Sequence, residues 1–249
     1  MEIQLIRNAT MKINYAGKTV LTDPMLSPKA AIDSFAGVAR NPIVELPLPV
    51  EQILDGIEGV IVSHGHPDHF DSAASAALPK TIPVFCQPDD ELRMAEEGFR
   101  TVIPIETDNV WNEITITRTG GRHGSGKILE RMGNVSGFVL QADGEPTVYW
   151  VGDSIWCKPV QEAITRFHPE VVITHSGGAT IPGFDPIIMD IDQTIATAKA
   201  SPEAIIVAIH MEALDHCPIS RVNLRQKVEK ELKRPSRIKI PKDSEVIAF

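Results

Sequence analysis

The stretch GVIVSHGHPDH, residues 59–69, decides the fold because it joins a short apolar strand to a dense group of ionisable side chains. Its last six residues carry three imidazoles and one carboxylate, on His64, His66, Asp68 and His69. Neutral imidazole and carboxylate are the natural ligands of zinc and its first-row neighbours. A solvated polar loop would rarely hold so many ionisable groups beside a buried strand. The stretch therefore predicts a metal site at the end of a strand.

The HGHPDH segment matches the HxHxDH signature, and in this respect the chain resembles the metallo-β-lactamase superfamily. The run Leu-Thr-Asp-Pro at residues 21–24 also resembles that family's metal-dependent hydrolases related to L-ascorbate-6-phosphate lactonase. The resemblance covers nearly the whole chain, because later motifs follow in the expected order. It implies an α/β (α+β) fold, a four-layer αββα sandwich with its metal site at one sheet edge.

Three later residues, His123, Asp153 and His210, each follow an apolar or alternating strand. Taken alone, each would more often be a hydrogen-bonded core or loop residue than a metal ligand. The resemblance implies a shared role for them with the HGHPDH loop. One metal would be bound by His64, His66 and His123, and a second by Asp68, His69 and His210, with Asp153 bridging both.

Two divalent ions are thus expected, with zinc the first choice and manganese or iron as alternatives, since all accept histidine and carboxylate ligands. Such ions lie about 3.5–4 Å apart in two-metal hydrolytic sites and can lower the pKa of a bound water from 15.7 to about 7. Hydroxide would then be available at neutral pH to attack an electrophilic carbon or phosphorus. In this scheme Asp68, Asp153 and His210 take part in catalysis as well as in metal binding.

Five further residues are candidates for supporting the site or touching substrate. Asp23 either accepts the second N–H of a ligand histidine or simply forms an Asp-Pro turn. His175 ends the strand 170–174, where a supporting or substrate role competes with a structural one. His216 lies near His210 in sequence and could reach substrate. Arg40 and Arg122 flank the lid or the ligand loops and would favour an anionic substrate.

One position departs from the family pattern. Relatives commonly carry Gly-His followed by Ala or Ser after the first strand, whereas this chain has Arg7-Asn8-Ala9. Asn8 can form hydrogen bonds but cannot titrate, so the role of that histidine is lost or replaced here.

Length and hydrophobic content predict one domain over residues 1–249. Short β-rich runs open the chain, and a proline-rich loop at residues 25–50 is a candidate active-site lid. Alternating polar and apolar residues at 114–117, 135–141 and 147–151 predict antiparallel strands. Helices are expected at residues 71–78, 89–97, 160–167, 192–200 and 220–232, and further strands at 83–86, 170–174 and 204–209.

Composition narrows the choice of partners. A formal net charge of −9 offers no basic field for nucleic acid, so a small-molecule substrate is expected. No signal peptide or membrane-spanning stretch is visible, and three scattered cysteines do not suggest a disulfide framework. We therefore expect a cytoplasmic protein without a membrane partner, with a homo-oligomer as one option.

Three functions compete on this basis. The first is metal-dependent hydrolysis of a small ester or lactone, with a phosphorylated substrate as one variant. The second is a phosphodiesterase or nuclease on the same scaffold, which the acidic charge disfavours. The third is a non-hydrolytic iron redox or metal-binding protein, although redox relatives usually need a flavin domain for which the chain has no room.

Overall fold

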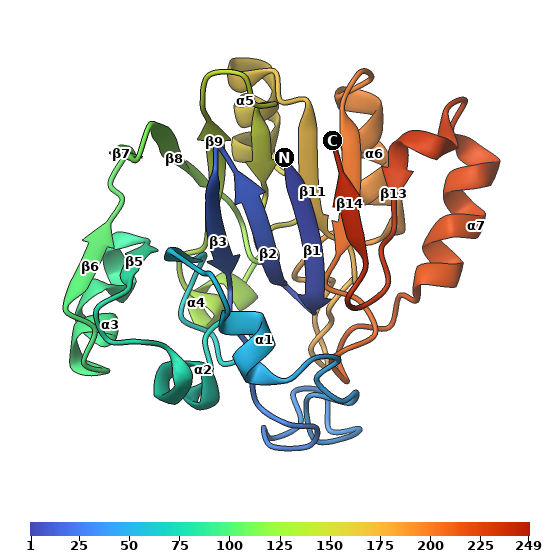
Figure 1. The fold of residues 1–249 in the computed structure, drawn as a ribbon. Coiled ribbons are helices and arrows are strands. Elements are labelled where there is room, and N and C mark those ends of the chain that lie inside the picture. The colour runs from blue at the N-terminus through green and yellow to red at the C-terminus, as the bar shows by residue number, and fades with distance from the viewer.

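Two seven-stranded sheets face each other in the computed structural model, which describes all residues 1–249 (Figure 1). The first sheet has the order β14-β1-β2-β3-β4-β5-β6. Its strands are β1 (Glu2–Arg7), β2 (Thr10–Tyr15), β3 (Lys18–Thr22), β4 (Gly59–Val62), β5 (Pro83–Cys86), β6 (Thr101–Pro104) and β14 (Val246–Ala248). Strand β14 pairs antiparallel with β1, so the two ends of the chain lie side by side (Figure 1).

The second sheet has the order β13-β12-β11-β10-β9-β8-β7. Its strands are β7 (Asp108–Trp111), β8 (Ile114–Gly120), β9 (Ser136–Gln141), β10 (Val148–Trp150), β11 (Val171–His175), β12 (Ile205–Ile209) and β13 (Ile238–Lys239). Strands β7 to β10 are antiparallel neighbours, whereas β10 to β13 run parallel. The antiparallel strands predicted in mid-chain are therefore confirmed.

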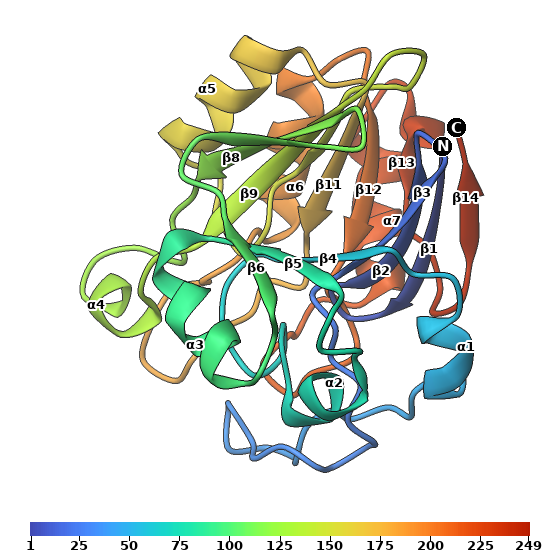
Figure 2. The ribbon, with the colours of Figure 1, turned by 60° about the vertical axis from the view of Figure 1, so that its left-hand side comes forward.

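Helices cover the outer face of each sheet (Figure 2). The first sheet carries α1 (Val50–Leu54), α2 (Ser72–Ala77) and α3 (Glu91–Glu96), and the second carries α5 (Lys158–Phe167), α6 (Ile191–Ala200) and α7 (Arg221–Glu231). The short α4 (Ile128–Met132) lies in the connection from β8 to β9, and two 3₁₀ turns occupy Pro88–Asp90 and Pro235–Arg237. The expected αββα sandwich is confirmed. None of these helices has the length and apolar character needed to cross a bilayer.

Alternating side chains build the layers. In β4, Ile61 points into the core between the sheets, whereas Val60 and Val62 pack toward α1 to α3. In β11, Ile173 faces the inner core and Val172 faces the outer helices. Both faces of these strands are buried, so each reads as a continuous apolar run.

Parallel strands determine where the polar loops meet. Strands β3, β4 and β5 are mutually parallel, and so are β10, β11 and β12. The carboxyl ends of parallel strands lie at one edge of their sheet, where open α/β sheets commonly bind ligands. The HGHPDH loop follows β4, whereas Asp153, His175 and His210 stand at or just beyond the ends of β10, β11 and β12.

The structure adds elements that the sequence patterns did not predict, namely α1, α4 and the edge strands β6, β7, β13 and β14. The helix predicted at residues 89–97 divides into a 3₁₀ turn and α3. The predicted cap of α2 is present, because the Asp71 carboxylate accepts a hydrogen bond from the Ala74 N–H. The loop predicted at residues 25–50 contains no helix or strand before Val50, only an isolated bridge between Ile32 and Asn41.

Candidate metal centre

The HGHPDH loop is held by a buried carboxylate from the neighbouring strand. Asp23 follows β3 and is fully buried. It accepts hydrogen bonds from the backbone N–H and the hydroxyl of Ser63, both at 2.7 Å, and lies 2.6 Å from Nδ1 of His69. Asp23 therefore does more than form a turn: it ties the first and last parts of the loop to one point.

The first group of candidate ligands contains His64, His66 and His123. Nε2 of His64 lies 2.9 Å from Nδ1 of His66, and the ring centre of His123 is 5.5 Å from that of His64. Nδ1 of His64 lies 3.0 Å from the Ser63 hydroxyl oxygen, and Nδ1 of His123 donates a hydrogen bond to the Ile187 carbonyl at 2.9 Å. Each of these two outer bonds leaves Nε2 directed at the shared centre.

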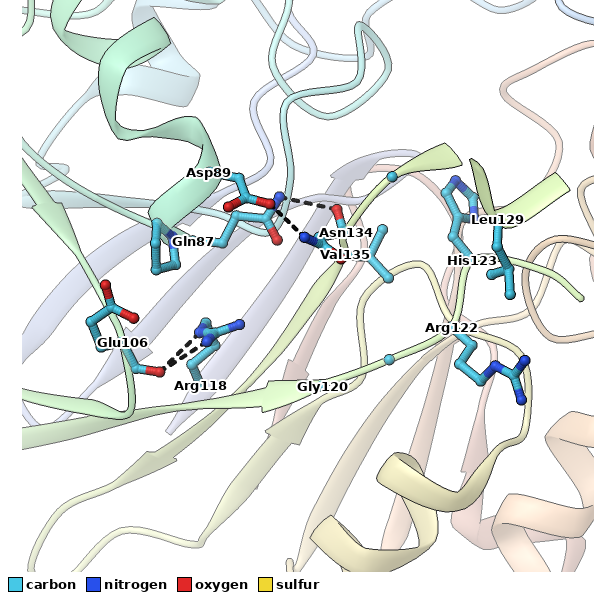
Figure 3. A pocket seen from close by; sticks show the side chains of 13 residues that line it. Gln87, Asp89, Glu106, Arg118, Gly120, Arg122, His123, Leu129, Asn134 and Val135 are labelled. Carbon is cyan, nitrogen blue, oxygen red and sulfur yellow. Dashed lines mark hydrogen bonds between the residues drawn. The ribbon is translucent and has the colours of Figure 1, made fainter. Parts of the chain in front are cut away.

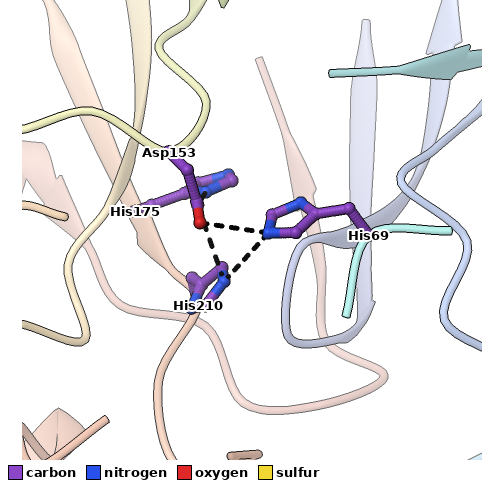
Figure 4. A group of neighbouring side chains, drawn as sticks. All are labelled: His69, Asp153, His175 and His210. Carbon is purple, nitrogen blue, oxygen red and sulfur yellow. Dashed lines mark hydrogen bonds and ion pairs between the residues drawn. The ribbon is translucent and has the colours of Figure 1, made fainter. Parts of the chain in front are cut away.

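The second group surrounds the Asp153 carboxylate (Figure 4). Nε2 of His69 lies 3.2 Å from Asp153 Oδ2 and 3.3 Å from Nε2 of His210. Oδ2 of Asp68 lies 3.5 Å from Nε2 of both histidines. Figure 4 shows His69 approaching from the side opposite to Asp153 and His210. The first sheet and the second sheet thus both supply this group.

Asp153 also faces the first group. Its Oδ2 lies 3.5 Å from Nε2 of His123 and 4.0 Å from Nε2 of His64. Gly152 makes this placement accessible: its φ is +70°, and a Cβ there would lie 2.4 Å from the Ser136 carbonyl oxygen. One carboxylate therefore stands between two sets of imidazoles, as a bridging ligand would.

His175 lies near the second group by distance but differs in its hydrogen bonds. The indole N–H of Trp150 can only donate, and it lies 2.9 Å from Nε2 of His175. Nε2 is therefore an acceptor, so Nδ1 carries the proton and donates to Asp153 Oδ1 at 2.5 Å. Both nitrogens are engaged, and the ring orients the carboxylate instead of offering a free lone pair to a metal.

Burial and charge shape the protonation of the side chains in the cluster. Burial lowers the pKa of His64 well below its ordinary value and that of His123 to about 4, so both are neutral at pH 7. Burial also opposes charge on His69 and His210, but nearby carboxylates, above all Asp153, outweigh the effect of burial. They raise the pKa of His69 well above its ordinary value and that of His210 to about 10. The same ion pairs hold the pKa of Asp68 and Asp153 well below the usual range despite burial.

Three residues near the centre have a left-handed backbone, with φ of +58° at Asn8, +37° at Asp23 and +61° at His210. Non-glycine residues in this region cost energy and persist where neighbours enforce them. Asn8 donates through its side chain to the Asp68 carbonyl at 3.1 Å, and its own carbonyl accepts from the His210 N–H. Asn8, at the position where relatives commonly have histidine, thus links two ligand-bearing segments.

A cleft of about 210 Å³ opens over the cluster. Its lining combines the cluster residues His66, Asp68, His123 and Asp153 with Ser34, Phe35, Pro67, Arg131, Met132, Ile181, Ile187 and His216. His216 is thus brought to the cleft, and its Nδ1 is buried without a hydrogen-bond partner. Its ring meets that of Phe35 edge-on, with centres 5.0 Å apart.

The two arginines expected near substrate are not among the lining of this cleft. Arg40 is exposed and pairs with Asp33 and with the carbonyls of Ala30 and Ala31, because the loop folds back on itself. Arg122 is also exposed and lines a neighbouring polar groove of about 650 Å³, which shares His123 with the cleft. Arg122 and His123 leave the chain in different directions there (Figure 3).

Other contributors to the site were not singled out from the sequence. Ser63 directly precedes the motif and could have been suspected, but Trp150 and Cys217 could not. Sγ of Cys217 lies 3.6 Å from Nδ1 of His210 and holds that ring from behind. Gly177 admits the His210 carbonyl, because a Cβ there would lie 2.1 Å from its oxygen.

Comparison with known proteins shows the family to which the chain belongs. A model of the beta-lactamase superfamily domain matches residues 18–211. The UPF0173 protein YddR of Bacillus subtilis (strain 168) is 36% identical over 255 residues, which cover 100% of both chains. The crystal structure of isothiocyanate hydrolase from Delia radicum gut bacteria is similar with a TM-score of 0.95 and 38% identity, covering 100% of this chain and 99% of that one. A possible metal-dependent hydrolase from Veillonella parvula DSM 2008 gives a TM-score of 0.96 and 36% identity over 100% and 99% of the two chains. The chain therefore belongs to the beta-lactamase superfamily, as one of its UPF0173 metal-dependent hydrolases.

Proposed function

We propose that the protein uses two divalent metal ions to hydrolyse a small, uncharged compound with an electrophilic carbon, and that an isothiocyanate is the first candidate. The observation that carries the proposal is the convergence of the two ligand groups on Asp153, directly beneath a small cleft whose walls include four apolar side chains. Imidazole and carboxylate donors suit zinc first, and manganese or iron also.

Each residue of the cluster has a distinct part in this proposal. His64, His66 and His123 would hold one ion, and Asp68, His69 and His210 the other, with Asp153 shared. Ions held in this way supply Lewis acidity and activate water at neutral pH. Asp23 and His175 keep His69 and the Asp153 carboxylate in fixed orientations, so that little reorganisation is needed on binding.

The cleft supports a small uncharged substrate. Phe35, Met132, Ile181 and Ile187 form apolar walls, and Arg131 is the single arginine or lysine that lines it. A phosphorylated substrate would be expected to meet further cationic side chains besides Arg131. A cleft of about 210 Å³ has room for a compact organic group, and it lies below the usual size of drug-binding pockets. Nucleic acid fits neither this size nor the net charge of −9.

An isothiocyanate, R–N=C=S, meets these demands and is the substrate class in the name of a relative that is 38% identical over the whole chain. Hydrolysis consumes one water: its oxygen bonds to the central carbon, the C–N bond breaks, and both water protons end on nitrogen. The products are the amine R–NH₂ and carbonyl sulfide. Asp68 and His216 line the cleft, and in this proposal they would pass a proton toward the leaving nitrogen.

A small ester or lactone is the second candidate, because its carbonyl carbon is attacked in the same way and its leaving oxygen also needs a proton. Both candidates are tested in one experiment. Protein purified without added metal is analysed for zinc, manganese and iron. Turnover is then measured on allyl isothiocyanate, p-nitrophenyl acetate, a γ-lactone and bis-p-nitrophenyl phosphate.

We expect metal in the purified protein and fastest turnover of the isothiocyanate. A His123→Ala variant should lose about a thousandfold or more in kcat/KM. The matched control is His168→Asn, because His168 is an exposed histidine just after α5. Preference for the phosphodiester, or unchanged turnover in His123→Ala, would contradict the proposal. An iron-dependent optical spectrum without any turnover would favour a redox protein instead.

A further inference from the structure

One carboxylate outside the metal cluster collects an unusual number of hydrogen bonds from the loop at residues 25–50. Oδ1 of Asp215 accepts from the Phe35 N–H at 3.1 Å and from the Asn41 side-chain amide at 2.9 Å. Oδ2 accepts from the Ala36, Val38 and Ala39 N–H groups at 3.2, 3.2 and 3.3 Å. The Ser34 hydroxyl also donates to Oδ2. The backbone N–H of Asp215 returns a bond of 2.8 Å to Asn41 Oδ1.

Within this part of the loop, the Ser34 hydroxyl oxygen also accepts hydrogen bonds from the Gly37 and Val38 N–H groups at 2.6 and 3.0 Å, but few other contacts hold it. Gly37, Val38 and Ala39 are exposed, and Val38 retains 78% of its accessible surface. Of the segment 34–39, Phe35 is the residue that packs, partly buried, against the apolar cluster of Ile181 and Ile187. Apolar burial therefore contributes little to the order of these residues, and the Asp215 carboxylate supplies most of their fixed contacts.

The charge of the Asp215 carboxylate strengthens its hydrogen bonds to the loop. Burial alone would raise the pKa of Asp215, but hydrogen bonds from Ser34, Asn41 and the loop backbone outweigh it and hold the pKa well below its usual range. The loop therefore stabilises the charged form of Asp215, and hydrogen bonds to a charged group are stronger than bonds between neutral groups.

These hydrogen bonds between the loop and the Asp215 carboxylate, here called the clamp, bear directly on the cleft, because the residues beside them form one wall of that cleft. Ser34 and Phe35 line the cleft on one side, and His216 follows Asp215 directly in the chain. The Phe35 ring rests edge-on against the His216 ring, with an angle of 79° between their planes. Two adjacent residues, Asp215 and His216, therefore contact two adjacent residues of the loop, Ser34 and Phe35.

We propose that Asp215 is a positioning residue that fixes the substrate-selecting wall of the cleft, keeping Phe35 against His216 so that only compact substrates reach the metal cluster. The selection part rests on the proposed function, whereas the clamp itself does not. Loosening the wall would widen the cleft toward the surface without moving any of the candidate metal ligands, because Asp215 contacts none of them.

The test compares Asp215→Asn with Asp33→Asn. Asparagine keeps the shape of the side chain but loses the charge and turns one acceptor into a donor that faces N–H groups. Asp33 is a matched control, because its exposed carboxylate lies on the same loop and pairs with Arg40. Hydrogen exchange of the amides at residues 35–39 should speed up about tenfold in Asp215→Asn and stay unchanged in Asp33→Asn.

Selectivity is measured in the same proteins as the ratio of kcat/KM for allyl isothiocyanate to that for a bulky naphthyl isothiocyanate. The ratio should fall about fivefold or more in Asp215→Asn, mainly through KM, with metal content unchanged. A Phe35→Ala variant, which leaves Asp215 intact, should show the same loss of selectivity and covers the case in which Asp215→Asn fails to fold.

The possible results test the clamp and the proposed function separately. Unchanged amide exchange in Asp215→Asn would overturn the clamp. Faster exchange with an unchanged selectivity ratio in both variants would overturn its role in substrate choice. If the protein hydrolysed neither isothiocyanate, the proposed function would fail, and the ratio would then be measured with short and bulky p-nitrophenyl esters while the exchange result stands by itself.

Discussion

The indole of Trp150 and the imidazole of His175 are joined by a hydrogen bond of 2.9 Å whose direction is fixed, because an indole N–H cannot accept. The bond places the proton of His175 on Nδ1, toward Asp153. A tryptophan in the core between the sheets thereby decides how a candidate bridging carboxylate is oriented.

Replacing Trp150 with phenylalanine should release His175 from its single tautomer and weaken metal binding about tenfold or more. The smaller ring should also cost about 2 kcal/mol of stability. Isothermal titration with zinc and denaturant unfolding would measure the two effects. Phe138→Leu is the control, because Phe138 neighbours Trp150 in the same core but makes no bond to the cluster. Equal zinc affinity in all three proteins would rule out this role for Trp150.

Asp23→Asn should reduce both stability and metal affinity. The asparagine cannot accept from Ser63 and His69 in the same way, so a buried N–H is left without a partner at a cost of about 2–3 kcal/mol. The control is Asp71→Asn, because Asp71 is also buried and accepts backbone N–H groups but touches no histidine of the cluster. Both variants should be destabilised, and only Asp23→Asn should need more zinc to reach half-saturation. A similar zinc requirement in both would show that Asp23 acts only on folding.

Cys217 should contribute to metal binding through His210. Cys217→Val removes the acceptor behind Nδ1 and should weaken zinc binding about tenfold, whereas Cys217→Ser keeps an acceptor and should retain most of the affinity. Competition with a coloured chelator would measure both constants. A serine variant as weak as the valine variant would indicate that packing around the thiol matters and its hydrogen bond does not.

The metal-free protein should become less stable as the pH rises from about 6.5 to about 10. Carboxylates around His69 and His210 raise their folded pKa above the unfolded value, to about 10 for His210. Their stabilising charge is therefore fully present below the unfolded pKa and lost as the pH rises through the folded one. Melting temperatures of chelator-treated protein across this interval would measure the effect, with zinc-loaded protein for comparison. A metal-free melting temperature that rises over the same interval would contradict the assignment.

Much of the fold could be predicted from local patterns. The strand at residues 59–62, the loop and the helix capped by Asp71 are adjacent in the chain, so their order was legible in the sequence. The edge strands could not be recognised from the sequence. Strand β14 forms because Ile247 pairs with Ile3, and this partner lies at the other end of the chain. Short strands whose pairing is this remote carry little pattern of their own.

The candidate ligands were foreseeable for a related reason, since each stands at a strand end where the chemistry of its side chain is conspicuous. The distinction between His175 and the other histidines was not foreseeable, because it depends on Trp150 across two paired strands. Arg40 was expected near substrate but is engaged within its own loop. Phe35 gave no signal, because its position depends on Asp215, which lies 180 residues further along the chain.

Each ligand group takes members from both sheets: His64 and His66 meet His123, and Asp68 and His69 meet Asp153 and His210. Neither half of the sandwich holds a complete ligand group by itself. Any ion held there would therefore stabilise the packing of the two sheets against each other. A chelator that removes the ion would make the sheets separate more readily, although the chelator contacts none of the apolar interior.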